Sequence, residues 1–269
     1  MIGRKAMVGL PLLCALLFSA IAVQNASATA GTNITGFTCA KVASKATGEF
    51  KDAHCDEKKS TENGYKHELI TGTTEAEATN ETTGGAKSTQ VIEGSPFKVA
   101  AKIECTTLTG SGTIENSEPS AKVHKLTGSG TLQLTGCTVV KPAKCTLKEP
   151  FVTKIGSVET QEVLTGPKGE ANAMGFEYRS PAGEPFGIIT LQGAECAIKE
   201  PCAVEGSVIA TGGPGSAEPQ TSTWSGATAV VTPAMSSLTI ASRPSTYEGT
   251  VTYRRKDATK AAITTTTVT

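Results

Sequence analysis

The chain has 269 residues, and its 25 basic and 25 acidic side chains give a formal net charge of zero. This balance offers no electrostatic attraction for nucleic acid or for an anionic membrane surface, so neither is expected as a partner. Aromatic residues make up 4% of the chain, and beyond its first residues no stretch shows the sustained 3.6-residue apolar period of long amphipathic helices.

Residues 1–28 have the pattern of a secretory signal peptide. Arg4 and Lys5 precede an apolar run that extends from residue 6 to residue 23, and Ala26-Ser27-Ala28 is a small-x-small cleavage site before Thr29. We therefore expect a secreted protein that is extracellular or associated with the cell wall and has no membrane span after cleavage. In such a compartment cysteines are expected to form disulfides.

Residues 29–90 form a polar segment rich in Lys, Glu and Thr, with few large apolar side chains. Such a segment buries too little apolar surface to fold alone, unless Cys39 and Cys55 staple it. The sequence predicts a small N-terminal β segment joined by a Cys39–Cys55 disulfide.

Residues 91–256 carry the clearest strand patterns. Apolar side chains alternate from Phe97 to Cys105, which is the period of a strand with one buried face. Turn sequences rich in Gly and Pro occur at residues 94–96, 166–169, 180–183 and 212–215. Many short strands between such turns indicate an all-β fold, an antiparallel β-sandwich or jelly-roll. The Thr-rich tail, residues 257–269, is expected to be disordered.

Two repeats stand out within this region. Leu108-Thr-Gly-Ser-Gly-Thr113 recurs letter for letter as residues 126–131. Cys145-Thr-Leu-Lys-Glu-Pro150 returns as Cys196-Ala-Ile-Lys-Glu-Pro201, and we interpret the two copies as equivalent hairpins. A binding alternative makes the Lys-Glu pairs 148–149 and 199–200 a repeated contact surface, but exposed charged turns are common and favour the structural interpretation.

Removal of the leader, which contains Cys14, leaves seven of the eight cysteines. Their number allows many pairings, and sequence alone does not select one. Short separations favour Cys39–Cys55, Cys137–Cys145 and Cys196–Cys202, with Cys105 unpaired. A Cys105–Cys137 pair is the alternative, because both residues lie on predicted strands of neighbouring repeats.

The segment Phe37-Thr38-Cys39, the segment Phe50 to Cys55, the segment Gly64 to Glu68 and the pair Thr79-Asn80 resemble a pattern of uncharacterised secreted proteins from soil actinobacteria. Residues 134–137 and 206–209 share this resemblance, which spans most of the mature chain. The resemblance implies an exported β-rich protein. It implies no activity and no functional residues.

Catalytic and metal-binding patterns are weak. The chain has three histidines, His54, His67 and His124, and lacks the Gly-x-Ser-x-Gly elbow of serine hydrolases. Glu159 and Glu162 lie three residues apart on a predicted strand, where they face opposite sides. His54, Cys55 and His67 fit no common zinc spacing. We expect no enzyme activity, no cofactor and no metal site.

The sequence favours a non-catalytic structural or interaction protein, with cell-wall or extracellular polysaccharide or another surface protein as its partner. A carbohydrate-binding module is the alternative, in which exposed aromatic rings stack on sugars. Trp224 and Tyr178 are the candidate stacking residues, although a lone Trp and the tyrosines at 247 and 253 fit the core as well. A secreted hydrolase is the third possibility.

Overall fold

The computed structural model describes residues 33–43, 47–52, 55, 64–81, 85–117, 125–165, 171–212, 224–225, 228–231, 236–259, 261 and 263–268. The predicted leader, residues 1–28, lies outside this range. Within the described residues the regular structure is almost entirely strand, and the strand ladders are antiparallel apart from one single-residue contact. The prediction of an all-β antiparallel fold is confirmed. None of the described helical segments is long and apolar enough to cross a membrane.

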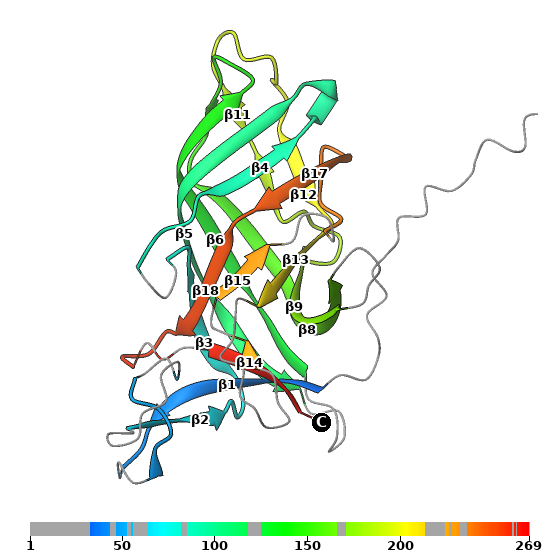
Figure 1. Ribbon diagram of the computed structural model, residues 1–269. Coiled ribbons are helices and arrows are strands. Elements are labelled where there is room, and N and C mark those ends of the chain that lie inside the picture. The colour runs from blue at the N-terminus through cyan, green and yellow to red at the C-terminus, as the bar shows by residue number, and fades with distance from the viewer. Residues whose placement is uncertain are drawn as a thin grey trace, which may run out of the picture.

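The central feature is a sheet that curls until it closes on itself (Figure 1). Successive antiparallel pairs run around this ring, and its last strand pairs again with its first. The two facing walls expected of a sandwich are therefore opposite sides of one continuous sheet. In order around the ring, the strands are β5 (Ala101–Ser117), β6 (Lys125–Lys141), β8 (Phe151–Thr165), β9 (Ala171–Arg179), β13 (Ser207–Gly212), β15 (Thr228–Val231), β18 (Thr250–Arg255) and β3 (Thr74–Thr79).

A second tier of strands continues the wall upward in Figure 1, where β4, β17 and β12 lie above β18, β15 and β13. The pairing runs from β5 to β4, and then in turn to β17, β16, β12 and β10. The Lys154 amide donates to the Phe186 carbonyl over 2.6 Å, which brings this tier back to β8. The upper strands are β4 (Gln90–Gly94), β10 (Gly187–Ile189), β12 (Cys202–Glu205), β16 (Thr239–Ile240) and β17 (Arg243–Glu248), with a separate pair formed by β7 (Thr146–Leu147) and β11 (Leu191–Gln192).

The predicted alternation explains how β5 faces the core. Ala101, Ile103 and Cys105 are buried, whereas Lys102 and Glu104 between them are only partly covered. Phe97 departs from the expected pattern, because Pro96 begins a short 3-10 turn, η2 (Pro96–Lys98), in which Phe97 has φ 51° and is 50% exposed.

The N-terminal strands cover the lower end of the ring. β1 (Asn33–Lys41) pairs with β2 (Tyr65–Leu69) and β19 (Ile263–Val268), and β14 (Trp224–Ser225) pairs with β19. The Asn116 side chain of β5 bonds to both the amide and the carbonyl of Gly36. The prediction of a disordered tail is wrong for residues 263–268, because Thr and Val suit a strand and β1 offers its edge for pairing.

The N-terminal segment predicted for residues 29–90 divides between two hydrophobic clusters. Cys39, Phe50, Cys55 and Ala261 form a small cluster of their own, with Tyr65 packed against it. Ile70 and the later residues of the segment join the main core, because β3 and β4 pair with β5.

Three disulfides connect the described residues. Cys39 is joined to Cys55, as the sequence predicts. The favoured Cys137–Cys145 pair is wrong. Cys137 lies directly opposite Cys105 in the β5–β6 register, and a disulfide joins the two. This is the pairing that the sequence offers as the alternative.

The favoured Cys196–Cys202 pair is wrong as well. Cys196 is joined to Cys145, because the pairing of β7 with β11 brings their two turns together. Cys202 is a free, buried thiol whose pKa is raised by burial.

Candidate functional site

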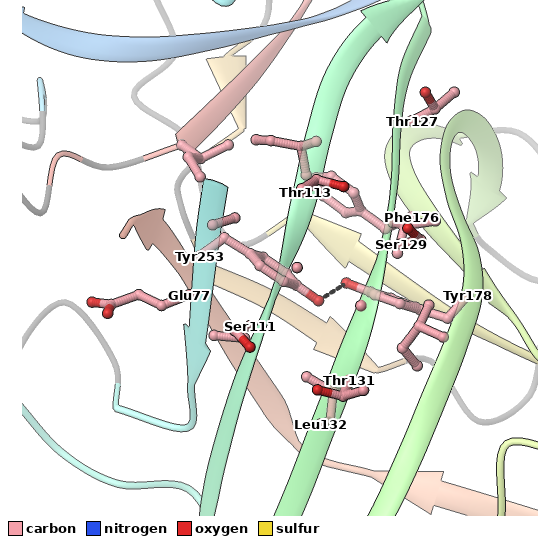
Figure 2. Close-up of a pocket in the computed structure, with 18 of the residues that line it drawn as sticks. Glu77, Ser111, Thr113, Thr127, Ser129, Thr131, Leu132, Phe176, Tyr178 and Tyr253 are labelled. Atoms are coloured by element: carbon pink, nitrogen blue, oxygen red, sulfur yellow. Dashed lines mark hydrogen bonds between the residues drawn. The ribbon is translucent and has the colours of Figure 1, made fainter. Parts of the chain in front are cut away.

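The interior of the ring contains a cavity of about 60 Å³ (Figure 2). The repeated Leu-Thr-Gly-Ser-Gly-Thr sequence creates part of its wall. On β5 and β6 every second residue faces the core, so each copy of the repeat places two glycines on the inner face. β3 adds two buried alanines beside them. The inner wall therefore lacks large side chains at Ala76, Ala78, Gly110, Gly112, Gly128 and Gly130.

A second cavity, of about 70 Å³, lies toward the upper tier. Large aliphatic and aromatic side chains line it, among them Ile92, Phe151, Phe186 and Leu238. Four residues border both cavities: Leu132, Ile155, Tyr178 and Tyr253. The two cavities are thus adjacent chambers of one apolar interior.

Tyr178 of β9 and Tyr253 of β18 lie where the chambers meet. Their rings are stacked, with centroids 6.4 Å apart, and the Tyr253 hydroxyl donates to the Tyr178 hydroxyl over 2.6 Å (Figure 2). Burial raises the pKa of both phenols well above the ordinary value of about 10. Both hydroxyls are therefore neutral at physiological pH.

Tyr247, a third tyrosine of this interior, has a different environment. Its hydroxyl donates to Oε1 of Gln90, a fully buried residue. The Gln90 Nε2 donates in turn to Ser88 Oγ over 2.8 Å and to the Thr250 carbonyl over 3.2 Å. A Cβ at Gly249 would lie against the Gln90 amide, so a larger residue where β17 passes into β18 would displace that amide from the network. This network fixes Tyr247 and occupies its hydroxyl.

Glu77 belongs to the wall of the first, lower cavity of about 60 Å³, but its side chain does not point into that cavity. Glu77 alternates with the buried Ala76 and Ala78 along β3, and its carboxylate points away from the tyrosine pair (Figure 2). Among the described residues that line the two cavities, the titratable side chains directed inward are the tyrosines.

The predicted stacking residues have different outcomes. The prediction that Tyr178 is an exposed ring on which sugars stack is wrong, because Tyr178 is 5% exposed and faces the interior. The backbone of Trp224 forms part of β14, but its side chain lies outside the described part of the structure. The cavities are not predicted from the sequence, although the repeated glycines carry their signal.

The residues weighed for metal binding do not assemble in the described structure. Cys55 is occupied by its disulfide, and the His67 ring packs against Phe50 with centroids 4.7 Å apart. His54 and His124 lie outside the described residues. The described residues contain no group of three or more His, Cys, Asp or Glu side chains that could hold a metal ion.

One side chain of each repeated Lys-Glu pair binds the protein's own backbone. Glu149 accepts hydrogen bonds from the amides of Gly136 and Cys137. Lys199 donates to the carbonyls of Gly193 and Ala194, over 3.0 and 2.8 Å. These contacts give Glu149 and Lys199 structural roles in their turns.

An open groove of about 760 Å³ lies at the outer rim of the upper tier. Serines and threonines line much of it, together with Glu93, Lys102 and Lys141. Lys102 forms ion pairs with Glu93 over 3.3 Å and with Glu104 over 3.2 Å, and hydrogen bonds to Glu104 and then Glu93 raise its pKa. The lining contains no aromatic side chain among the described residues.

Comparison of the chain with protein-family models, with curated proteins and with solved structures finds no match.

Proposed function

We propose that the chain is a secreted, non-catalytic binding protein that holds a small apolar molecule inside its closed sheet. The observation that carries the proposal is the pair of adjacent apolar chambers bordered by Tyr178 and Tyr253. Binding sites for small molecules combine apolar walls with a few placed polar groups, and this interior has that composition. Among the described lining residues, the neutral phenols and aliphatic walls offer no general base or activated nucleophile for ordinary catalysis.

The chamber volumes limit the size of the ligand. A dry apolar cavity of roughly 150 Å³ accommodates benzene. Each chamber here has about half that volume, at about 60 and 70 Å³. We propose that a ligand of benzene-like size occupies both chambers after the side chains between them shift.

Export is part of the proposal. Three disulfides fit an oxidising compartment. The leader pattern and the resemblance to exported actinobacterial proteins support the same location. N-terminal sequencing of exported material is expected to begin at Thr29, or at Gly31 if the Ala28-Thr29-Ala30 site is cut. An intact leader on membrane-bound material would contradict this proposal.

Calorimetric titration of the mature protein with toluene tests ligand binding. We expect saturable binding and a melting temperature that rises with toluene concentration, because a ligand selective for the folded state stabilises it. Ala76→Val adds two methyl groups beside the lower cavity and is expected to weaken binding. Ala203→Val is the matched control, because Ala203 alternates with buried residues of β12 and lies outside both cavity walls. Absence of toluene binding to the wild-type protein would overturn the proposal.

The rim groove favours carbohydrate binding as a second candidate function. Its volume of about 760 Å³ lies within the range of small-molecule sites, and its hydroxyl and charged groups suit sugar hydroxyls. A glycan array that includes soil polysaccharides tests this function. Lys141→Ala should reduce any specific signal, whereas Lys154→Ala, outside the groove, should leave it unchanged. An array without a Lys141-dependent signal would contradict this candidate.

A further inference from the structure

Within the described part of the chain, one of the two hydrogens of the Tyr178–Tyr253 hydroxyl pair has no acceptor. Two hydroxyls that bond to each other employ one of their two hydrogens. Among the described residues, the hydrogen bond between Tyr253 and Tyr178 is the one contact recorded for either hydroxyl. A buried donor without an acceptor is unfavourable, because it has lost water and gained no partner.

This spare hydrogen lies where the two chambers meet. Tyr178 and Tyr253 border both chambers, and Tyr178 is almost fully buried. The hydroxyl of Tyr247, which lies on the wall of the upper chamber, already donates to Gln90. Among the described residues that line the two chambers, the tyrosine pair therefore supplies the one buried hydroxyl hydrogen without an acceptor, at the place where the apolar chambers meet.

We propose that this pair recognises a small apolar molecule that carries one hydrogen-bond acceptor oxygen, such as a cyclic ketone or ether. The inference rests on the proposed function and specifies its ligand class. The hydrocarbon part of the ligand fills the chambers, and its oxygen accepts the spare hydrogen. By comparison with a benzene-sized cavity, such a molecule has about six to eight non-hydrogen atoms.

Cyclohexanone and methylenecyclohexane provide a matched pair of probes, since they have nearly the same shape and differ in C=O against C=CH₂. The measured quantity is the ratio of their dissociation constants, compared between variants so that differences in hydration cancel. In the Tyr178→Phe/Tyr253→Phe double variant, the preference for the ketone should fall about five- to tenfold, the value of one neutral hydrogen bond. Replacing both partners with rings of the same shape leaves no orphaned hydroxyl, so the fold should persist.

Two further comparisons make the test specific. Each single variant, Tyr178→Phe or Tyr253→Phe, leaves one hydroxyl with a free hydrogen and should keep most of the ketone preference. Tyr247→Phe is the control within the same interior, and it should keep the preference because that hydroxyl is bonded to Gln90. An unchanged ratio in the double variant, with both probes still bound, would overturn the ligand class but not the proposed function.

A measurement on the wild-type protein keeps the inference testable if the double variant does not fold. The infrared carbonyl stretch of bound cyclohexanone should lie below its position in a hydrocarbon solvent, as expected for a hydrogen-bonded carbonyl. A stretch at the hydrocarbon position would overturn the inference. Failure of both probes to bind would overturn the proposed function itself and the inference with it.

Discussion

Cys145 and Cys196 occupy the same position in two copies of one sequence motif, and a disulfide joins them. β7, which lies within the first copy, pairs with β11, which ends at Gln192 before the second copy begins. Lys199 then bonds to the loop that precedes Cys196, and Glu149 bonds to the backbone beside Cys137. The repeat thus stabilises the upper end of the closed sheet.

Removal of this disulfide should destabilise the whole sheet. The two cysteines are 51 residues apart, and closing such a loop restricts the unfolded chain by about 4 kcal/mol in the entropy model. In the Cys145→Ala/Cys196→Ala double variant, the free energy of unfolding measured by urea titration should fall by about 4 kcal/mol. Cys202→Ala is the control, because it removes a buried thiol without opening a loop. Equal losses in the two variants would contradict the assigned role.

The Cys39–Cys55 disulfide should act more locally. Both cysteines belong to the small cluster with Phe50 and Ala261, separate from the main core. In Cys39→Ala/Cys55→Ala, hydrogen exchange is expected to accelerate in β1, β2 and β19 while β5 and β6 stay protected. Uniform acceleration across all five strands would show that the cluster is not a separate unit of stability.

Gly112 should be intolerant of a methyl group. A Cβ at this position would lie 2.1 Å from the Ser129 carbonyl oxygen and 2.9 Å from Gly130 Cα on the neighbouring strand. We expect Gly112→Ala to cost about 1–3 kcal/mol in the free energy of unfolding, the usual cost of overpacking. Gly64→Ala should cost less than the Gly112 change, because a Cβ there would meet no atom within 4 Å from the described residues beyond its chain neighbours. Thermal unfolding of both variants measures the difference.

The buried phenols predict a loss of stability at high pH. Burial raises the pKa of Tyr178, Tyr247 and Tyr253 in the folded protein above the unfolded value of about 10. A raised folded-state pKa stabilises the protein below the unfolded pKa, and this contribution is lost as pH rises above it. Ultraviolet absorbance should show these phenols ionising together with unfolding. Their ionisation in a protein that remains folded would contradict the buried assignment.

The sequence predicts the strands better than their closure. Alternation from residue 101 to residue 105 identifies the inner face of β5, because that information is local. Ring closure depends on pairs such as Tyr253 with Ala78, which are distant in the chain and have no local signature. The candidate role of Tyr178 as an exposed stacking residue is wrong for the same reason, since its burial comes from strands elsewhere in the sequence.

The candidate site, too, is predictable from the sequence only in its local patterns and not in its long-range pairing. The two copies of Leu-Thr-Gly-Ser-Gly-Thr are visible in the sequence, but their meaning depends on register. Only when Gly112 pairs with Gly130 do the glycines share one patch of the inner wall. The Cys145–Cys196 disulfide likewise depends on β7 meeting β11, which short cysteine separations do not predict.

Methyl-detected NMR during a toluene titration is the sharpest test of ligand binding inside the closed sheet. We expect saturable shifts centred on the methyl groups of Ala76, Ala78, Leu132 and Ile155, which line the interior. The outward-facing methyl group of Ala203 should serve as an internal reference and stay unchanged. Shifts confined to surface methyl groups, or no shifts at saturating toluene, would show that the interior of the closed sheet is not a binding site.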